Sequence, residues 1–453
     1  MFSSVNPVTQ KVLMNYDSMS SDQIVLAIET ADNVFRRWKK IPLEERVEMI
    51  KSIGKALRDK TEEYAILLTK EMGKLKAEAE GEILKCAWLC DYYAENAQNF
   101  LAPEVIDTEY SKSYVAYQPL GVILGIMPWN YPFWQSFRFA VPALLAGNTV
   151  LLKPAPNVPQ SGIALEYIFS EAFERKGVFQ TILAEVEDIP SIINHPMVSG
   201  VSLTGSNKAG SAVASQAGTA IKKCLLELGG SDPFIVLEDA DLDKAVDMGF
   251  ASRMINCGQT CISAKRFILH EKIADRFING LKRKIDSLTQ GDPADPQTSI
   301  SVMARKDLAE ALQIQVDNSV TMGANILHNG GHLDKKSNYF HPMILGNVKK
   351  GMPAYEEELF GPVFTVFMVK SEKEAIDIAN DSIYGLGASV WSEDQVAAES
   401  IALELEVGAV AINDMVKSDP RLPFGGVNQS GFGRELALEG MREFVNIKSV
   451  VLK

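Results

Sequence analysis

Short apolar segments that alternate with helical ones point to a parallel α/β fold for most of this chain. Residues 122–127 form an apolar run typical of a strand buried on both faces, and residues 149–152 form another, with a helical segment at 141–146 between them. Parallel units of this kind bind ligands beyond the carboxyl ends of their strands. Because Asn130 and Lys153 follow the two strands, we expect both side chains at a ligand site.

The alternation continues through the second half of the chain. Further strands are predicted at 179–183, 200–203, 234–237, 265–269, 365–369, 387–391 and 409–413. The first hundred residues are instead predicted to be helical, at 23–38, 43–58, 62–71 and 75–100. A chain of 453 residues is too long for one hydrophobic core, so we expect two or three domains.

The turn at Thr204, Gly205 and Ser206 lies between a predicted strand and a predicted helix at 208–217. Such a turn directs backbone N–H groups and the helix dipole toward a phosphate. The spacing matches neither a GxGxxG fingerprint nor a P-loop, so an ordinary helix N-cap is the alternative. Glu227, further along, lies within an apolar run, where a charged side chain is costly unless it is paired or functional.

Cys261 ends a polar, glycine-containing stretch that begins at Asn256. A loop between two regular elements is where a fold presents a nucleophile, and an inert buried thiol is the alternative. A disulfide from Cys257 to Cys261 would inactivate the thiol, but tight loops rarely allow that geometry. Cys86 and Cys90 share one helix face without further ligands at matching spacing, so we expect them in the core and predict no metal site.

Charge and composition exclude several classes of partner. The formal net charge of −13 is spread along the chain, which argues against nucleic acid and anionic membranes. No apolar run approaches the length of a membrane span, and no secretory hydrophobic region follows the first residues. Five cysteines, an odd number, fit free thiols in a reducing compartment, so a cytoplasmic protein is expected.

Seven short motifs taken together resemble the aldehyde dehydrogenase superfamily in order and spacing. They are PWNYP at 128–132, LLKPA at 151–155, TGS at 204–206, LELGG at 226–230, GQTC at 258–261, EELFGPV at 357–363 and PFGG…SGFGRE at 423–435. The resemblance covers essentially the whole chain. It implies a Rossmann-like cofactor-binding domain (1–100 and 121–229), an α/β catalytic domain (230–434) and a small β oligomerisation element (101–120 and 435–453).

The resemblance also implies the catalytic roles. Cys261 is expected to attack an aldehyde carbon, because hydride can leave only after that carbon becomes tetrahedral. The side-chain amide of Asn130 and the backbone N–H of Cys261 would hold the oxyanion. Glu227 would deprotonate the water that hydrolyses the thioester, and its apolar setting suits a raised pKa.

The cofactor implied by the resemblance is NAD or NADP. The residues expected to bind it are Lys153 at the adenosine ribose, Ser206 with Gly205 at the pyrophosphate, Glu358 at the nicotinamide ribose, and Trp129, Leu228 and Phe360 along the site. Relatives that prefer NAD carry a glutamate three residues after the lysine, where this chain has Pro156. Nothing at that position repels NADP, and the sequence favours NAD only slightly.

Within the superfamily the chain resembles the succinate-semialdehyde dehydrogenases. Arg138 and Ser418 match two of their carboxylate-binding residues. Arg138 could instead be an arginine with a purely structural role in its helix. Their second arginine is replaced by Ile255, with Arg253 and Arg421 as candidate substitutes. Another small aldehyde or semialdehyde therefore stays open as the substrate.

The apolar residues 445–452 have the pattern of an edge strand that pairs with another subunit, so we expect a homodimer or homotetramer. Three other functions stay open. They are a cofactor-independent cysteine hydrolase, a catalytically silent protein on the same fold, and a dehydrogenase that passes the acyl group to coenzyme A.

Overall fold

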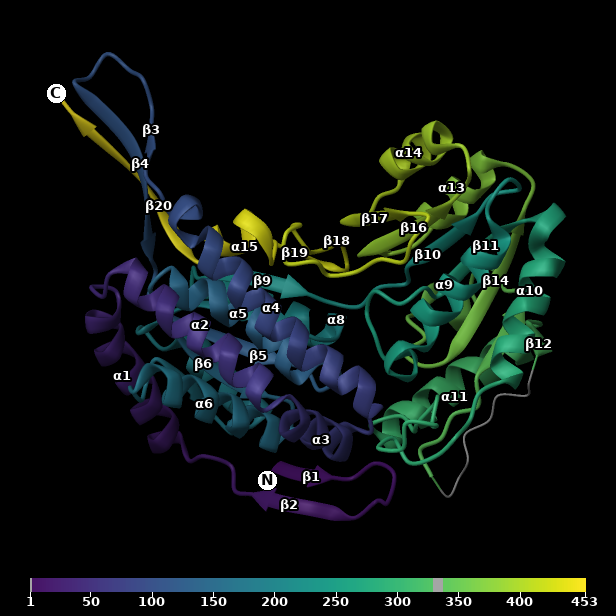
Figure 1. Ribbon diagram of the computed structural model, residues 1–453, viewed down its shortest axis with the longest axis horizontal. Helices are drawn as coiled ribbons and strands as arrows, with labels where there is room; N and C mark the ends of the chain where they lie inside the picture. The colour runs from purple at the N-terminus through teal and green to yellow at the C-terminus, as the bar shows by residue number, and fades with distance from the viewer. Residues whose placement is uncertain (1, 329–336) are drawn as a thin grey trace.

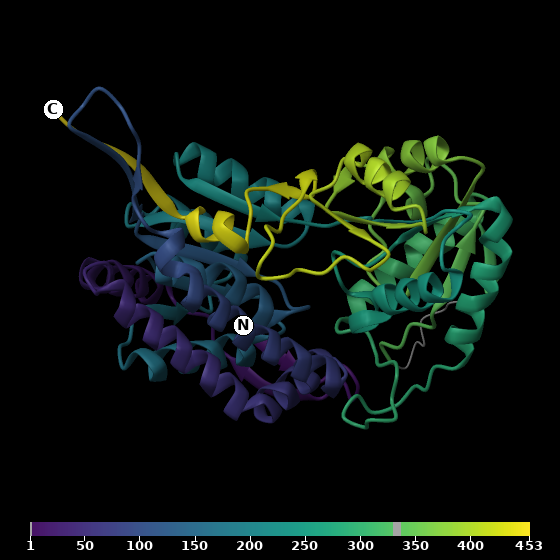
Figure 2. The same cartoon turned by 45° about the horizontal axis from the view of Figure 1, so that its top comes forward.

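The computed structural model describes residues 2–328 and 337–453 and arranges them in two lobes and a projecting sheet (Figures 1 and 2). The first lobe contains a six-stranded sheet in the order β19-β9-β8-β5-β6-β7. Its strands are β5 (Val122–Met127), β6 (Thr149–Pro154), β7 (Phe179–Thr181), β8 (Val198–Thr204), β9 (Lys223–Glu227) and β19 (Gly431–Phe432). All neighbours are parallel except β19, which pairs antiparallel with β9.

Helices cover both faces of this sheet. They are α1 (Ser21–Trp38), α2 (Leu43–Asp59), α3 (Thr61–Met72), α4 (Lys76–Phe100), α5 (Pro132–Leu145), α6 (Pro159–Phe173), α7 (Ile189–Asn194) and α8 (Asn207–Thr219). Alternate strand residues face opposite helix layers. Leu151 packs in the cluster with α1, α7 and α8, whereas Val150 and Leu152 pack with α4, α5 and α6.

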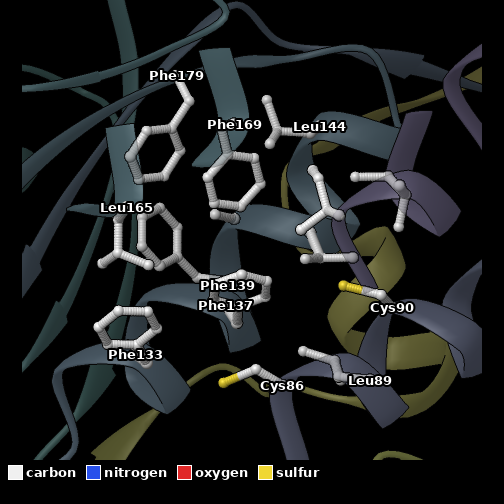
Figure 3. Close-up of a cluster of buried hydrophobic side chains, with 14 of the residues drawn as sticks. Cys86, Leu89, Cys90, Phe133, Phe137, Phe139, Leu144, Leu165, Phe169 and Phe179 are labelled. Carbon is white, nitrogen blue, oxygen red and sulfur yellow. The ribbon is translucent and has the colours of Figure 1, made fainter. Parts of the chain in front are cut away.

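Cys86 and Cys90 of α4 lie in the second of these clusters. Both side chains are fully buried beside phenylalanines of α5 and α6, as predicted for core residues (Figure 3). All five cysteines are free. No group of His, Cys, Asp and Glu that could hold a metal ion occurs within the described ranges.

The second lobe contains a seven-stranded sheet in the order β12-β13-β14-β11-β10-β16-β17. Its strands are β10 (Pro233–Val236), β11 (Arg266–His270), β12 (Asn325–His328), β13 (Met343–Gly346), β14 (Val363–Val369), β16 (Gly387–Trp391) and β17 (Ala409–Ile412). One face packs on α9 (Leu242–Met254) and α10 (Glu271–Asp286). The other face packs on α11 (Lys306–Thr321), α12 (Pro353–Glu356), α13 (Glu372–Asn380) and α14 (Gln395–Glu404).

The remaining strands form three small sheets. The strands β3 (Glu104–Val105), β4 (Lys112–Pro119) and β20 (Val445–Leu452) form the projecting sheet at the C-terminus (Figure 1). A short helix, α15 (Ala437–Arg442), precedes β20 and packs on α5. The strands β15 (Tyr384–Gly385) and β18 (Val427–Asn428) pair with each other, as do β1 (Phe2–Val5) and β2 (Val12–Tyr16).

Three features differ from the sequence-based expectations. The N-terminal region is not entirely helical, because β1 and β2 form a hairpin whose second strand is exposed and so lacks an apolar alternation. Helix α5 begins at Pro132 rather than at 141, since proline suits the first turn of a helix. The predicted boundary at 434 does not follow the sheets, because β19 joins the first-lobe sheet beside Glu227. In the described part of the chain no helix is long and apolar enough to cross a membrane.

Candidate active site

The carboxyl ends of the first-lobe strands bring together side chains that are far apart in the sequence. Asn130 follows β5, Lys153 lies near the end of β6, Ser206 follows β8, and Glu227 ends β9. Strand register places Lys153 opposite Ile126, and Glu227 opposite the last residue of β8. The four residues therefore lie along one edge of the sheet, where parallel α/β folds bind their ligands.

The loop before Cys261 is a short 3-10 turn with an unusual backbone. Asn256 and Cys257 have φ values of +54° and +55°, which non-glycine residues adopt only at a cost of about 1–3 kcal/mol each. The Asn256 side chain donates to the Asn130 carbonyl at 3.0 Å and to the Gln259 carbonyl at 3.2 Å. Its backbone N–H donates to Glu78 Oε1 at 3.0 Å. These bonds hold the strained conformation.

Gly258 allows this turn to approach the second lobe. A Cβ at this position would lie 2.5 Å from the carbonyl carbon of Gly361, and φ is +73°. Only glycine combines the left-handed conformation with such a close backbone approach. The buried Arg253 fixes the same contact, because its guanidinium donates to the carbonyl oxygens of Leu359, Gly361 and Val363.

Of the two expected oxyanion donors, the Cys261 N–H comes shortly after this turn, and Asn130 is hydrogen-bonded to the loop that follows it. Asn130 Nδ2 donates one hydrogen to the Gln259 carbonyl at 3.0 Å, and Asn130 Oδ1 accepts from Gln135 Nε2 at 3.3 Å. These bonds fix the orientation of the amide and leave its second N–H available. The backbone N–H of Cys261 has no hydrogen-bond acceptor among the described residues.

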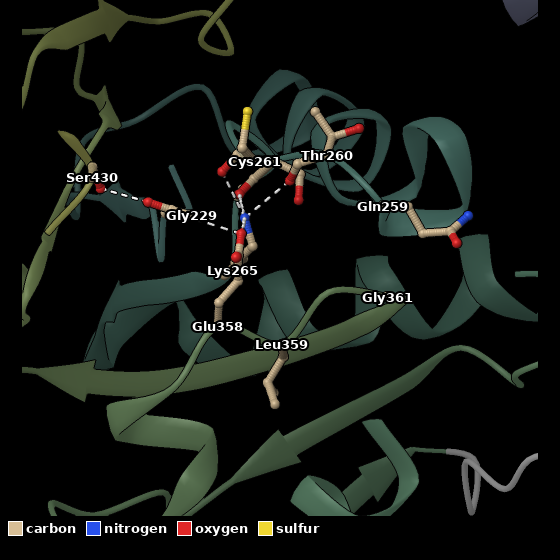
Figure 4. Close-up of polar contacts among 12 residues, drawn as sticks. Gly229, Gln259, Thr260, Cys261, Lys265, Glu358, Leu359, Gly361 and Ser430 are labelled. Carbon is tan, nitrogen blue, oxygen red and sulfur yellow. Dashed lines mark hydrogen bonds and ion pairs between the residues drawn. The ribbon is translucent and has the colours of Figure 1, made fainter. Parts of the chain in front are cut away.

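Lys265 is a residue of the candidate site that the motifs did not reveal. Its ammonium group donates to the carbonyl oxygens of Cys261 at 2.7 Å and Thr260 at 3.0 Å, and it lies 3.2 Å from Glu358 Oε1 (Figure 4). Glu358 also accepts from the Gly230 N–H at 3.2 Å. Lys265 thus links Glu358, the carboxylate expected at the nicotinamide ribose, to the loop that carries Cys261.

The surroundings of the Cys261 thiol favour its protonated form. Burial raises its pKa to about 12, although the nearby positive charges of Arg138 and Lys265 oppose that rise. Cys257 points elsewhere, because its thiol donates to the Ser301 carbonyl at 3.6 Å and packs in the second-lobe core. No disulfide joins the two cysteines.

Glu227 shares a buried charge cluster with Glu435 and Arg138. Arg138 Nε lies 2.7 Å from Glu435 Oε2, with side-chain exposures of 3% and 1%. Burial, followed by the negative charge of Glu435, raises the pKa of Glu227 well above its usual range, while Arg138 lowers it. Burial also raises the pKa of Glu435. Glu435 closes the SGFGRE motif, which was the only sequence signal for it.

The residues expected at the adenosine end of the cofactor lie near a buried side-chain amide and an open turn. Lys153 is buried, and burial lowers its pKa. Pro156 is exposed, and the next residue, Asn157, has a buried amide whose Oδ1 and Nδ2 find no partner in the described ranges. A Cβ at Gly205 would meet only one atom, 3.6 Å away, so the turn before Ser206 is open. Asn157 had no sequence signal of its own.

The residues expected along the rest of the cofactor lie in two groups. Trp129 and Phe360 meet edge to face, with ring centroids 6.0 Å apart. Leu228 is buried against Gly210 of α8. A Cβ at Gly229 would lie 2.5 Å from Glu358 Oε2, so a glycine is needed beside that carboxylate.

A cavity of about 290 Å³ opens onto the side chain of Cys261. Its lining includes Cys261, Arg138, Ser418, Ile255 and Lys85. Neither Asn130 nor Glu227 belongs to this lining.

The two substitutes considered for the missing arginine are wrong. The side chain of Arg253 is fully buried on backbone carbonyls and the Ser263 hydroxyl. Arg421 is 64% exposed, pairs with Asp419, and does not line the cavity.

Comparison with known proteins agrees with this geometry. The model of the aldehyde dehydrogenase family matches residues 1–450. The succinate-semialdehyde dehydrogenase (NADP(+)) of Deinococcus radiodurans is 43% identical over 99% of this chain and 94% of the relative. The succinate semialdehyde dehydrogenase (NAD(P)+) Sad of Escherichia coli K12 is 43% identical over 99% and 97%.

A solved structure extends the comparison to three dimensions. The succinic semialdehyde dehydrogenase of Streptococcus pyogenes, in complex with NADP+, is 36% identical, covers 100% of both chains and superimposes with a TM-score of 0.98. The predicted fold class is therefore confirmed. By its sequence, its fold and its site, this chain belongs to the aldehyde dehydrogenase family.

Proposed function

We propose that this protein oxidises succinate semialdehyde to succinate, with NADP as the preferred cofactor. The observation that carries the proposal is a single cavity that contains the Cys261 thiol together with Arg138 and Ser418. The cavity walls are otherwise largely apolar, so a four-carbon chain fits between a nucleophile and carboxylate-binding groups. Arg138 Nη2 is buried without a hydrogen-bond partner in the described residues, and a substrate carboxylate would supply one.

The first half of the reaction forms the acyl enzyme. The Cys261 thiol loses its proton to solvent, and the thiolate attacks the aldehyde carbon. This gives a thiohemiacetal whose oxyanion lies against Asn130 Nδ2 and the Cys261 N–H. A nicotinamide held by the residues named above would supply the acceptor for the hydride that leaves this carbon. The carbonyl then re-forms as a thioester on Cys261.

The second half hydrolyses the thioester. Glu227 takes a proton from water, and the resulting hydroxide attacks the thioester carbon within the same oxyanion site. The carbon–sulfur bond breaks, the Cys261 thiolate leaves, and succinate is released. Glu227 keeps the proton until it passes to solvent, so an enzyme with this base needs no coenzyme A.

The cofactor preference is proposed as NADP rather than NAD. The slight preference for NAD drawn from the sequence is not confirmed, because the Deinococcus radiodurans relative and the solved structure carry NADP in their names and the Escherichia coli relative carries NAD(P). Lys153 and Asn157 are the residues that would hold a phosphorylated ribose, and Pro156 places no carboxylate beside it. Pro156→Glu should therefore raise KM for NADP at least roughly tenfold while changing KM for NAD little, because a like charge repels the 2′-phosphate.

The projecting sheet is proposed to join subunits in a homodimer or homotetramer. Strand β20 is an edge strand with exposed apolar side chains at Ile447, Val451 and Leu452. Sedimentation equilibrium at micromolar concentration should give a mass of at least two chains. The cytoplasm stays the proposed compartment, since five free cysteines fit a reducing environment.

Initial rates with a panel of aldehydes and both cofactors test the substrate and the cofactor together. We expect kcat/KM for succinate semialdehyde to exceed that for butyraldehyde by at least roughly tenfold. Higher values for butyraldehyde would contradict the roles of Arg138 and Ser418. Addition of coenzyme A should leave succinate as the product, and formation of succinyl-coenzyme A would contradict hydrolysis by Glu227.

A further inference from the structure

Ser418 has already used its capacity to accept hydrogen bonds. Lys85 Nζ donates to Ser418 Oγ at 2.9 Å, and Trp134 Nε1 donates to the same oxygen at 3.0 Å. A hydroxyl group has one O–H donor and two acceptor lone pairs. With both lone pairs occupied, Ser418 can only donate, and no acceptor for this hydrogen occurs among the described residues. A ligand placed here should therefore present an acceptor such as a carboxylate oxygen.

Lys85 brings a positive charge to the same point. It lies on α4, lines the cavity, and places its ammonium 4.3 Å from the ring centroid of Trp134. No carboxylate pairs with it in residues 2–328 and 337–453, and only one of its three N–H bonds is donated, to Ser418. A half-buried cation without a counter-ion is costly unless a ligand supplies the negative charge.

The position of the missing arginine is apolar, because Ile255 lines the cavity there. We propose that Lys85 supplies the second cation for the distal carboxylate of the substrate, beside Arg138 and the donating Ser418. This inference rests on the proposed function. It assigns to Lys85 the selectivity for a semialdehyde over an uncharged aldehyde. The positive charge of Lys85 comes from helix α4 of the first lobe, whereas the expected arginine would have come from the segment just before Cys261.

The charged groups around Lys85 make this recognition sensitive to pH. Burial and then the charge of Arg138 lower the pKa of Lys85 to about 8, while Cys86, Asp419 and Glu82 raise it. Below this pH the ammonium is present and binds a carboxylate, and above it the charge is lost. The ratio of kcat/KM for succinate semialdehyde to that for butyraldehyde should therefore fall as pH rises through about 8.

Three variants test the proposal: Lys85→Met, Lys85→Arg and the control Lys76→Met. For Lys85→Met we expect kcat/KM with succinate semialdehyde to fall roughly 10- to 100-fold, mainly through KM, because a charge-assisted hydrogen bond is lost. The value for butyraldehyde should change less than about threefold, and Lys85→Arg should recover most of the loss. Lys76 lies on the same helix outside the cavity lining and pairs with Glu62, so its variant should match the parent.

Equal losses on both aldehydes in a Lys85→Met variant with parental thermal unfolding would overturn the proposal. So would a substrate ratio in the parent enzyme that stays constant from about pH 6.5 to 9.5, a measurement that needs no variant. A parent enzyme without any preference for succinate semialdehyde would instead refute the proposed function itself. The two failures are therefore distinguishable.

Discussion

Removal of the Glu82 carboxylate should destabilise the first lobe more than any surface change. Glu82 Oε1 accepts from the backbone N–H groups of Phe133 and Trp134 at 3.0 and 3.1 Å, which satisfies the first turn of α5. Glu82 Oε2 pairs with Lys74, and the two side chains are 1% and 0% exposed. The ammonium of Lys74 also lies 3.6 Å from the ring centroid of Tyr131.

Two substitutions separate these contributions. Breaking a buried ion pair from one side costs about 3–5 kcal/mol, because the other charge stays buried. Loss of a helix cap adds about 1 kcal/mol. Glu82→Ala should therefore lower the free energy of unfolding by about 4–6 kcal/mol, and Glu82→Gln, whose amide oxygen still caps α5, by about 3–5 kcal/mol. The double variant Lys74→Met/Glu82→Gln should recover most of this loss, since no unpaired charge remains.

Urea unfolding followed by tryptophan fluorescence measures these differences as shifts of the midpoint at constant slope. Glu80→Ala serves as the control, because this carboxylate forms only an exposed contact with Lys76, at 3.7 Å. The control should leave the midpoint unchanged. A loss below about 2 kcal/mol for Glu82→Ala, or a double variant as unstable as Glu82→Gln, would refute the reasoning.

Three further predictions concern the chemistry. Cys261→Ala should lower kcat by more than roughly 10⁴-fold while NADP still quenches tryptophan fluorescence, and parental turnover would exclude this nucleophile. Glu227→Gln should release about one equivalent of reduced cofactor in a burst and then stall, and steady turnover at the parental rate would remove the base role. Because burial and Glu435 raise the pKa of Glu227, the base should be protonated, and hydrolysis slowed, at pH values well above 4.5. Arg138→Met removes the positive charge that lowers the pKa of Glu227, so the acidic limb of the pH–rate profile with butyraldehyde should move to higher pH. An unmoved limb would contradict the electrostatic coupling of Arg138 to Glu227.

Local patterns were sufficient for elements that are apolar and sharply bounded. The predicted strands at 122–127, 387–391 and 445–452 have the bounds of β5, β16 and β20. The bounds of β5 are the clearest, because Gly121 and Pro128 flank its apolar run. The hairpin of β1 and β2 has no such signal. Its stability depends on contacts from other parts of the chain, such as the bond from Gln160 to Ser4.

The residues of the candidate site also differ in whether the sequence alone could predict them. Cys261, Asn130 and Glu227 stand in motifs whose order is recognisable, so the sequence alone names them. Lys85 could not be found in that manner, because a lysine on a long helix looks like any solvated residue. Its partner Ser418 lies 333 positions away, and only the folded chain brings the two together.

The strained turn before Cys261 shows how the two lobes act as one site. Asn256 and Cys257 hold a conformation that costs about 1–3 kcal/mol for each residue, and the bonds that stabilise it come from Asn130 and Glu78 of the first lobe. From the second lobe, Lys265 donates to the Cys261 carbonyl, and Arg253 holds the carbonyls of Leu359 and Gly361 in the segment on which Gly258 packs. Because both lobes supply these bonds, we expect that contact between the lobes is needed to orient the Cys261 N–H toward an oxyanion.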